Sequence, residues 1–325
     1  MTQMNIVQAV NNALHVEMES DEDVMVLGED IGVNEGVFRV TEGLLDKFGE
    51  DRVRDTPLAE SGIVGVSIGL ALYGMKPVAE IQFMGFMWPA LDQLSSHASR
   101  YRNRSRSQYH VPMVLRAPYG GGVKALEHHS ESFESVLAHI PGLKVVIPST
   151  PKDAKGLLIS SIRDPDPVVF LEPKKLYRAF TQDVPEGSFT EVLGKARVVH
   201  EGEDITLVGW GAMVPKMVKA ADHVSEEGIS AEVIDLRTIY PYDEEMVHES
   251  IRKTGRLLVV QEAPRTLGFG SEVVARAVKK ELLSLKSPPL RATGFDVPFP
   301  LYKMQDWAIP DVDRIVKKIR GSIEW

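Results

Sequence analysis

A glutamate at the start of an apolar, glycine-rich segment is the first group in this sequence that could do chemistry. Glu60 lies in the run DTPLAESG, and glycines follow at positions 62, 65, 69 and 74. Residues 61–73 are expected to form a helix, whose positive N-terminal end favours an anion such as Glu60. Glycine inside a helix costs about 0.5–1 kcal/mol relative to alanine, so several in one helix indicate that a backbone or ligand approaches closely. A routine first-turn acid with glycine packing spacers explains the same residues.

Two adjacent histidines form a second group of candidates. Gly120, Gly121 and Gly122 are followed by the segment EHHSES, which contains His128 and His129. The glycine run lacks the Lys-Ser/Thr of a P-loop, so a flexible loop is the simpler interpretation. Neighbouring histidines do not share a helix face as the zinc-binding i, i+4 pair does. One of them could donate a proton, because imidazole titrates near neutral pH, or it could be structural.

Aromatic residues follow the strand expected over residues 77–83. The segment EIQFMGFMW holds Gln82, Phe83 and Phe86. Ligands of parallel sheets bind beyond the carboxyl ends of the strands, and aromatic rings there could stack on a flat heterocycle. Ordinary core packing is the alternative.

The elements that must position these groups alternate between strand and helix, with β-branched runs rather than strict in-and-out alternation. This pattern predicts parallel sheets covered on both faces. Two doubly wound α/β domains in tandem are therefore expected. The predicted helices cover residues 6–18, 61–73, 88–101, 151–162, 214–225, 243–253, 270–285 and 311–319. The predicted strands cover residues 24–27, 77–83, 113–115, 143–147, 167–171, 205–209, 231–236, 257–260 and 290–293.

The alternation is interrupted by a segment rich in charged and turn-forming residues, PKKLYRAFTQDVPEGSF. We place the domain linker there. The first domain is predicted to cover residues 1–175, the linker 176–203 and the second domain 204–325.

Composition excludes several classes of function. The chain has 325 residues, 43% of them hydrophobic, and a formal charge of −9, which gives no general attraction to nucleic acid or anionic lipid. It has no cysteine, so disulfides and thiolate sites are excluded. The longest nearly apolar stretch, residues 62–75, is too short to span a bilayer. No apolar signal-peptide run or transit peptide is seen near the start, and a cytoplasmic location is expected.

Taken in order, several segments resemble the β subunits of thiamine-diphosphate-dependent 2-oxo acid dehydrogenases, which include pyruvate, branched-chain and acetoin enzymes. The first half contributes GEDIGVNEGVFRVTEGL, DTPLAESGIVGVSIGLALYGMKPVAEIQF, HSES and PGLKVVIPSTPKDAKGLL; the second contributes GKARVV, EVIDLRTIYPYD, KTGRLLVVQEAP and GFDVPFP. DTPLAESG is the most specific. The resemblance implies a transketolase-like fold, with a pyrimidine-binding domain followed by a transketolase C-terminal domain. It also implies oxidative decarboxylation of a 2-oxo acid and reductive acylation of lipoyl groups.

The same resemblance assigns roles to single residues. Glu60 falls on the glutamate that hydrogen-bonds the aminopyrimidine ring of thiamine diphosphate, and Phe86 on an aromatic packed near that ring. Gln82 lies on the same strand end. His129 falls on an active-site histidine that could donate a proton during acyl transfer to lipoamide.

Metal sites and partners follow from the resemblance as well. No Gly-Asp-Gly motif occurs in the chain, so Mg²⁺ and the diphosphate contacts are expected on a separate α subunit, in an assembly of two α and two β chains. A dihydrolipoyl acyltransferase is the further expected partner, through its lipoyl and subunit-binding domains; acidic residues near the C-terminus suit a basic partner. A possible potassium ion, held largely through backbone carbonyls, falls on Met113, Ser161, Ile162, Asp164 and Asp166.

Other interpretations stay open at this point. Transketolases and 1-deoxyxylulose-phosphate synthases normally carry both cofactor halves in one polypeptide, and this chain is too short for that. A dinucleotide-binding protein without catalytic function would need Gly-x-Gly-x-x-Gly, and the spacing after Gly209 and Gly211 fails. An acetoin dehydrogenase β subunit and a purely structural subunit are further alternatives. The substrate is not fixed, because Phe86 resembles pyruvate enzymes whereas His128-His129 and GFDVPFP resemble branched-chain ones.

Overall fold

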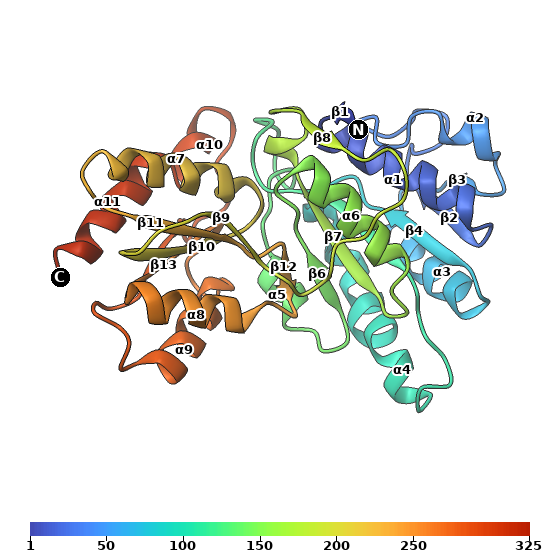
Figure 1. Ribbon diagram of the computed structural model, residues 1–325. Helices are drawn as coiled ribbons and strands as arrows, with labels where there is room; N and C mark the ends of the chain where they lie inside the picture. Colours follow the sequence, from blue (N-terminus) through green and yellow to red (C-terminus); the bar gives the residue numbers. More distant parts are fainter.

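The computed structural model describes residues 1–325. It shows two α/β units side by side, the N-terminal unit on the right and the C-terminal unit on the left of Figure 1. Each unit is built on one main sheet with helices on both faces, as the alternating pattern predicts. None of the helices is long and apolar enough to cross a membrane.

The first unit contains a seven-stranded sheet in the order β12-β6-β7-β5-β4-β2-β3. Six strands are parallel, whereas β12 pairs antiparallel with β6 at one edge. The six parallel strands therefore end at one edge of the sheet. The strands are β2 (Val24–Gly28), β3 (Val53–Asp55), β4 (Lys76–Glu80), β5 (Val114–Tyr119), β6 (Lys144–Val146), β7 (Val168–Pro173) and β12 (Thr238–Tyr240).

Helices α1 (Ile6–Ser20) and α6 (Pro151–Ile162) pack together over one face of this sheet. Their ends are fixed locally: Asn5 forms a capping box at α1, and Thr150 caps α6, whose first residue is Pro151. On the other side, α3 (Glu60–Leu72) packs against the 3₁₀ segment η1 (Met84–Ala90). Short helices α2 (Leu44–Phe48) and α5 (Glu134–Ala138) complete the unit.

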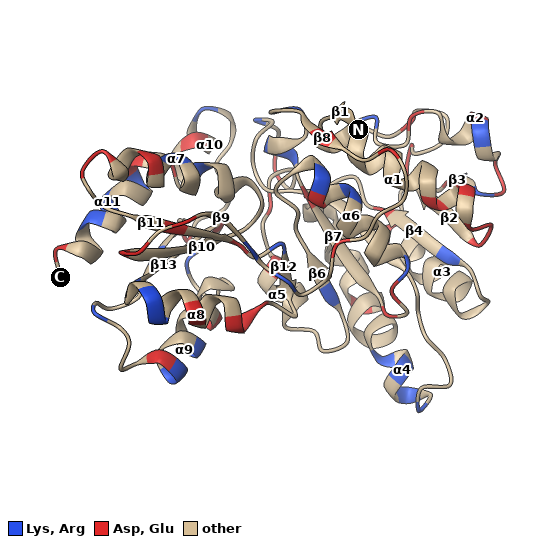
Figure 2. Cartoon of the chain, viewed as in Figure 1, with Lys and Arg blue, Asp and Glu red and all other residues tan.

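The single helix predicted over residues 88–101 is wrong. In its place η1 is followed by a π turn η2 (Gln93–His97), a 3₁₀ turn η3 (Ala98–Arg100) and a short helix α4 (Tyr101–Arg104). Pro89 lies inside η1, and the hydroxyls of Ser96 and Ser99 bond to Asp92 Oδ1 and the Ser95 carbonyl. Such local bonds compete with a regular helix. Basic residues gather on α4 (Figure 2).

The second unit contains a five-stranded sheet in the order β14-β13-β10-β11-β9, with β9 antiparallel at its edge. Helices α7 (Val214–Ser225) and α11 (Val312–Ile323) cover one face, and α8 (Glu244–Thr254) and α9 (Gly270–Glu281) cover the other (Figure 1). The short α10 (Gln305–Ala308) precedes α11. The strands are β9 (Arg197–His200), β10 (Ile205–Gly209), β11 (Ala231–Asp235), β13 (Leu257–Pro264) and β14 (Leu290–Gly294).

The predicted linker, residues 176–203, is not free of regular structure. It contains β8 (Gln182–Val184), which pairs antiparallel with β1 (Thr2–Met4), and also the edge strand β9. Conversely, β12 lies beyond the linker in sequence but joins the first sheet. The two main sheets are therefore mixed rather than purely parallel, because each has one antiparallel edge strand. The exact domain boundaries stay a prediction.

The contact between the two units is apolar and closely packed. Both large clusters of buried apolar side chains contain residues of both units. Polar bonds add to it: Asp153 of α6 accepts hydrogen bonds from Arg197 and Arg237 of the second unit. We call this contact the seam.

Candidate active site

An acidic cluster lies where β2, β3 and β4 end. Gly28, the last residue of β2, pairs with Asp55 and with Glu80, so the segments after these strands start from neighbouring points. Glu29 follows β2, and burial raises the pKa of its carboxyl, with smaller contributions from the charges of Asp30 and Glu60. None of Glu29, Asp30 and Glu60 takes part in an ion pair. The cluster is therefore a concentration of negative charge without a protein cation.

Glu60 is the first residue of α3 and is half-buried. Ala59 precedes it and supplies no side-chain cap, so the first backbone N–H groups of the helix favour a carboxylate or another anion nearby. Gln82 joins the same cluster because its Nε2 donates to Asp30 Oδ2 over 3.2 Å. The structure thus brings together Glu60 and Gln82, which the sequence analysis had named separately.

An aromatic group borders this cluster. Phe83 and Phe86 meet edge to face, and the ring of His129 lies 4.4 Å from the Phe83 centroid and 5.1 Å from that of Phe86. Gly85 makes this approach possible, because a Cβ at that position would overlap the backbone of His128. Phe86 and His129 are therefore neighbours in space, as well as candidates in sequence.

The two histidines differ in their surroundings. His128 is exposed and has a φ of 65°, whereas His129 is half-buried. Nδ1 of His129 lies 2.8 Å from the Glu127 carbonyl oxygen. A carbonyl can only accept, so this bond places a proton on Nδ1 and leaves Nε2 for other chemistry. Between the two, His129 is the one held in place.

A buried ion-pair network under this site was not predicted as such. Arg116 Nη1 donates to Glu80 over 2.8 Å, Arg116 Nε donates to Glu172 over 2.7 Å, and the Tyr177 hydroxyl donates to Glu172 over 2.6 Å. Burial raises the pKa of Glu80, and the charge of Arg116 opposes that shift. The network ties the ends of β4, β5 and β7 together. The sequence signal for this network is that Glu80, Arg116 and Glu172 are charged residues in otherwise apolar strands.

The glycine run and two further residues have roles that the sequence did not show. The glycine run is not a phosphate cradle or a free loop, because Gly120 and Gly121 press against the second unit and Gly122 presses against the backbone of Lys175. Lys174, which is buried, donates hydrogen bonds to the carbonyls of Gly120 and His129. Glu262, also buried, accepts from the Gly121 N–H.

The residues proposed for potassium lie elsewhere, before β5 and β7 and therefore at the opposite end of the sheet. Lys144 Nζ is 2.6 Å from Asp164 Oδ1 and 3.6 Å from Asp166 Oδ2, and Arg102 Nε is 2.6 Å from Asp166 Oδ1. The Met113 carbonyl accepts from the Val168 N–H, and the Ser161 carbonyl from the Asp164 N–H; Ile162 is buried at the end of α6. Protein cations thus already neutralise both carboxylates, and no group of three or more His, Asp or Glu side chains could hold a metal. The two carboxylates are therefore not free for potassium, and an ion held largely by backbone carbonyls at these positions stays a prediction.

Comparison with known proteins matches two family models. Residues 2–180 match the transketolase pyrimidine-binding domain, and residues 194–315 match the transketolase C-terminal domain. The sequence is 52% identical to the pyruvate dehydrogenase E1 component subunit beta of Acholeplasma laidlawii, over 98% of both chains. It is 50% identical to the protein of the same name from Bacillus subtilis, over the full length of both.

Solved structures agree with this fold. A split-gene transketolase described as an inactive beta4 tetramer superposes with a TM-score of 0.80 at 22% identity, covering 99% of both chains. A transketolase variant from Pichia stipitis gives a TM-score of 0.72 at 14% identity, and the match covers all of this chain but 46% of that one. The transketolase-like fold expected from the sequence is confirmed.

Proposed function

The chain belongs to the β subunits of the pyruvate dehydrogenase E1 component, and on this premise we propose that Glu60, Gln82, Phe86 and His129 form its half of the active site. The family makes it a component of a thiamine-diphosphate-dependent 2-oxo acid dehydrogenase. The observation that carries the residue assignment is the unpaired acidic cluster beside an aromatic group and a held imidazole.

The donor set suits the aminopyrimidine half of the cofactor. When bound, thiamine diphosphate supplies a thiazolium carbon that adds to the oxo group and accepts electrons as carbon dioxide leaves. Glu60 has no protein cation as a partner, so its carboxylate is free to share a proton with a ring nitrogen. Gln82 supplies an amide already directed into the cluster by Asp30, and Phe86 offers an aromatic surface to a flat ring.

His129 is suited to moving a proton during acyl transfer. Its Nδ1 is occupied by the Glu127 carbonyl, and its ring is confined by Phe83 and Phe86. With Nδ1–H bonded to the Glu127 carbonyl, Nε2 of the neutral ring can take up a proton, and the resulting imidazolium can give that proton to the thiolate that forms when the disulfide of lipoamide opens. We assign it that role.

The other half of the site belongs to an α subunit. The chain lacks Gly-Asp-Gly and offers no cluster of metal ligands, so we place Mg²⁺ and the diphosphate contacts on the partner. Helix α3, which starts at Glu60, presents an exposed row of Gly62, Val66, Gly69 and Tyr73 at helical spacing. Val66 is 57% and Tyr73 90% exposed, and such a row of small and apolar residues suits packing against another helix. We propose that the α subunit covers it in an assembly of two α and two β chains.

Pyruvate is the proposed substrate, because the relatives at 50–52% identity are named for it. The test is to purify the chain together with its α subunit and compare decarboxylation of pyruvate, 2-oxobutanoate and 3-methyl-2-oxobutanoate with an artificial electron acceptor. We expect the highest kcat/KM for pyruvate. A clear preference for 3-methyl-2-oxobutanoate would show a branched-chain enzyme, and no decarboxylation of any of the three would contradict the proposed function.

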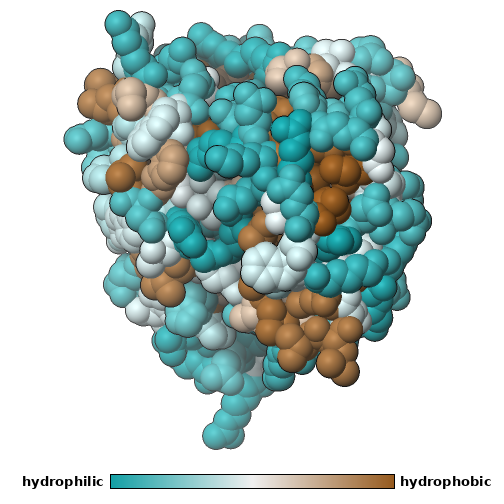
Figure 3. Space-filling model, turned by 90° about the vertical axis from the view of Figure 1, so that its left-hand side faces the viewer, coloured by the Kyte–Doolittle hydropathy of each residue, from teal (hydrophilic) through white to brown (hydrophobic).

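A dihydrolipoyl acyltransferase is the proposed second partner, docking on the C-terminal unit. Figure 3 shows this side of the molecule as mainly hydrophilic with separate hydrophobic patches. Some of its acids are used internally: Asp296 binds Thr266, Asp306 pairs with Lys124 and Asp311 caps α11. Among the last thirty residues, the acids left without an ion pair or cap are Asp313 and Glu324, and the exposed C-terminal residue is Trp325.

Surface plasmon resonance against the basic subunit-binding domain at two ionic strengths tests this docking. Deleting Glu324 and Trp325 should weaken binding, and association should slow as salt screens the charges over about 8 Å at 0.15 M. Asp51→Ala, which removes an exposed acid of the first unit, is the matched control. Unchanged affinity after the deletion, with no effect of salt, would place the docking site elsewhere.

A further inference from the structure

We propose that Glu262, a carboxylate of the second unit, is a positioning residue that fixes the place of His129 in the first unit. The inference rests on the role proposed above for His129, and it adds a route by which the second unit takes part in catalysis. Glu262 lies on β13 near its carboxyl end and is 7% exposed. Its carboxylate accepts a hydrogen bond from the backbone N–H of Gly121.

The loop that carries His129 is closed on itself. It leaves β5 at Tyr119 and returns at Glu131, where the Gly120 N–H donates to the Glu131 carbonyl over 2.9 Å. His129 lies two residues before this closure. A displacement of the Gly120–Gly121 backbone is therefore passed on to His129 over a short path.

The glycines show how tightly the second unit holds this loop. A Cβ on Gly120 would lie 2.9 Å from both carboxylate oxygens of Glu262. On Gly121 it would lie 2.6 Å from Ile309 and 2.9 Å from Phe299, both from the second unit. Gly120 also has a φ of 74°, which disfavours side chains. No residue other than glycine allows the loop backbone to come this close.

Lys174 holds the same loop from the first unit. Its ammonium donates to the carbonyls of Gly120 and His129 and lies 5.5 Å from the centre of the Phe83 ring. Phe83 in turn contacts the His129 ring. Lys174 thus connects the glycine segment bound by Glu262 to the backbone of His129 and, through Phe83, to the His129 ring.

Glu262 is not placed there by a favourable ion pair. No Lys, Arg or His nitrogen lies within ion-pair distance of it, and burial raises its pKa, opposed by the Gly121 bond and by Lys216 and Lys174. Burying a carboxylate without a direct cationic partner costs stability. A role in holding the loop accounts for a group that stability alone does not explain.

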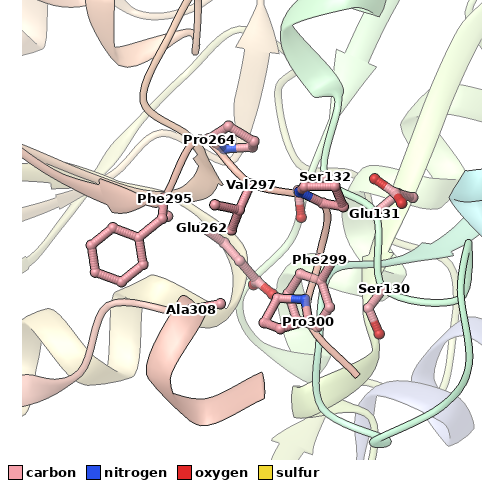
Figure 4. Close-up of a pocket in the computed structure, with 12 residues that line it drawn as sticks. Ser130, Glu131, Ser132, Glu262, Pro264, Phe295, Val297, Phe299, Pro300 and Ala308 are labelled. Atoms are coloured by element: carbon pink, nitrogen blue, oxygen red, sulfur yellow. The ribbon is translucent and has the colours of Figure 1, made fainter. Parts of the chain in front are cut away.

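The seam around Glu262 is not completely filled. A cavity of about 70 Å³ is lined by Glu262, Phe299 and Pro300 of the second unit and by Ser130 and Ser132 of the first. Figure 4 shows Glu262 next to Phe299 and Pro300, with Ser130 and Ser132 on the facing segment. The hydroxyls of Ser130 and Ser132 have no protein hydrogen-bond partner. The serine hydroxyls therefore do not hold the segment after His129; its backbone is held by the bond from Lys174 to the His129 carbonyl and by the Gly120–Glu131 bond, which joins it to the strand end contacted by Glu262.

A double-mutant cycle in the assembled α/β enzyme tests the proposal. Glu262→Ala should lower the rate of acyl transfer to a lipoyl domain by about 10–100-fold, because small displacements of a reacting group have effects of that size. In the His129→Ala background the same change should have almost no further effect. Glu262→Gln keeps an acceptor for the Gly121 N–H and should stay within about fivefold of wild type.

Glu281→Ala is the matched control, since Glu281 is a 6% exposed carboxylate of the same unit on α9, away from the loop. If Glu262→Ala does not assemble, Lys174→Met cuts the other contact to the loop and should show the same non-additivity. Losses that multiply in the double variant, or normal transfer in Glu262→Ala, would overturn the proposal while leaving the role of His129 intact. Normal transfer in His129→Ala alone would instead refute the proposed role of His129, and this inference with it.

Discussion

The two sheets end in similar ways but put their terminal carboxylates to different uses. Beyond the ends of β2 and β3, Glu29, Asp30 and Glu60 have no protein cation and remain partly accessible. At the ends of β11 and β13, Asp235 and Glu262 are buried in the seam. Asp235 accepts from the Ser149 hydroxyl and Glu262 from the Gly121 N–H, both in the first unit.

The difference shows that the strand ends of a parallel sheet provide a place for chemistry without deciding what it is used for. In the first unit they stay open beside Phe86 and His129. In the second unit the first unit covers them, and the carboxylates become contacts between the units. Whether another unit covers the strand ends, more than which residues stand there, therefore decides whether their carboxylates can take part in a reaction or only connect the two units.

The largest effect is expected from removing Glu60, the carboxylate proposed to share a proton with the cofactor at the accessible strand ends of the first unit. Glu60→Ala or Glu60→Gln should lower decarboxylation of the 2-oxo acid by about 10²–10⁴-fold, as loss of a proton-sharing group does. Assembly with the α subunit and cofactor affinity should change little, because Glu60 is not expected to bind the diphosphate. Steady-state decarboxylation assays and calorimetry of cofactor binding measure both. Glu50→Ala, an exposed acid of the same unit, is the control, and turnover of the Glu60 variants within a few-fold of wild type would remove the assignment.

A smaller effect is expected from disturbing the contact between the aromatic group and the histidine loop. A methyl group on Gly85 would overlap the backbone of His128, so Gly85→Ala must displace the segment that carries His129. Acyl transfer should fall by about 10–100-fold, and decarboxylation should fall less. Gly187→Ala is the control, because a Cβ there meets nothing within 4 Å. Equal losses in the two partial reactions would show a general disruption of the site instead.

In the seam, the buried carboxylate of Asp235 is expected to affect the free energy of unfolding. Burial raises the pKa of Asp235 to about 7, whereas an aspartate in water has a pKa of about 3.9. An acid whose pKa is raised by folding stabilises the protein least above that pKa, so its burial cost grows as pH rises from about 4 to 7 and is constant above. Asp235→Asn mimics the protonated acid and should therefore stabilise the protein at pH 8 by up to about 4 kcal/mol, at 1.36 kcal/mol per pKa unit.

The gain for Asp235→Asn should be clearly smaller at pH 5, and urea unfolding at the two pH values measures it. Asp51→Asn, at an exposed position, should change the free energy of unfolding little at either pH. A destabilised Asp235→Asn variant at pH 8 would mean that the ionised carboxylate is needed in the seam.

The smallest effect is expected at the amino ends of the first sheet. Lys144 and Arg102 already pair with Asp164 and Asp166, so a potassium ion here would depend on backbone carbonyls alone, and we expect it to add little stability. The midpoint of thermal unfolding in potassium chloride and in choline chloride of equal ionic strength should agree within about 1 °C, since 1 kcal/mol corresponds to roughly 2–4 °C in chains of 150–250 residues. A rise of several degrees with potassium alone would show that the ion binds despite these pairs.

Local sequence patterns predicted most of the helices and strands, and also the positions of Glu60, Gln82 and Phe86 next to them. The strand predicted over residues 205–209 is β10 and the helix predicted over 214–225 is α7, because apolar runs and periodicity determine them locally. Glu60 begins α3 within one residue of the expected start, and Gln82 and Phe86 follow β4 as a strand-end position requires.

What the sequence did not show depends on contacts between distant segments. Strands β9 and β12 are short and become strands only by pairing with β11 and β6. The function of Gly120 and Gly121 depends on Glu262, more than a hundred residues away, and no local pattern links the two. Lys174 likewise lies in a charged segment just before the predicted linker. Its role follows only from its contact with the loop that carries His129, which is distant in sequence.

The central claim is that this chain supplies the carboxylate and imidazole side of the site, while another chain supplies the metal and the diphosphate contacts. Calorimetric titration of thiamine diphosphate with Mg²⁺ into the purified chain alone, and into the same chain assembled with its α subunit, tests it most directly. We expect weak or no binding to the isolated chain and tight, magnesium-dependent binding to the assembly. Tight, magnesium-dependent binding to the isolated chain would contradict the account.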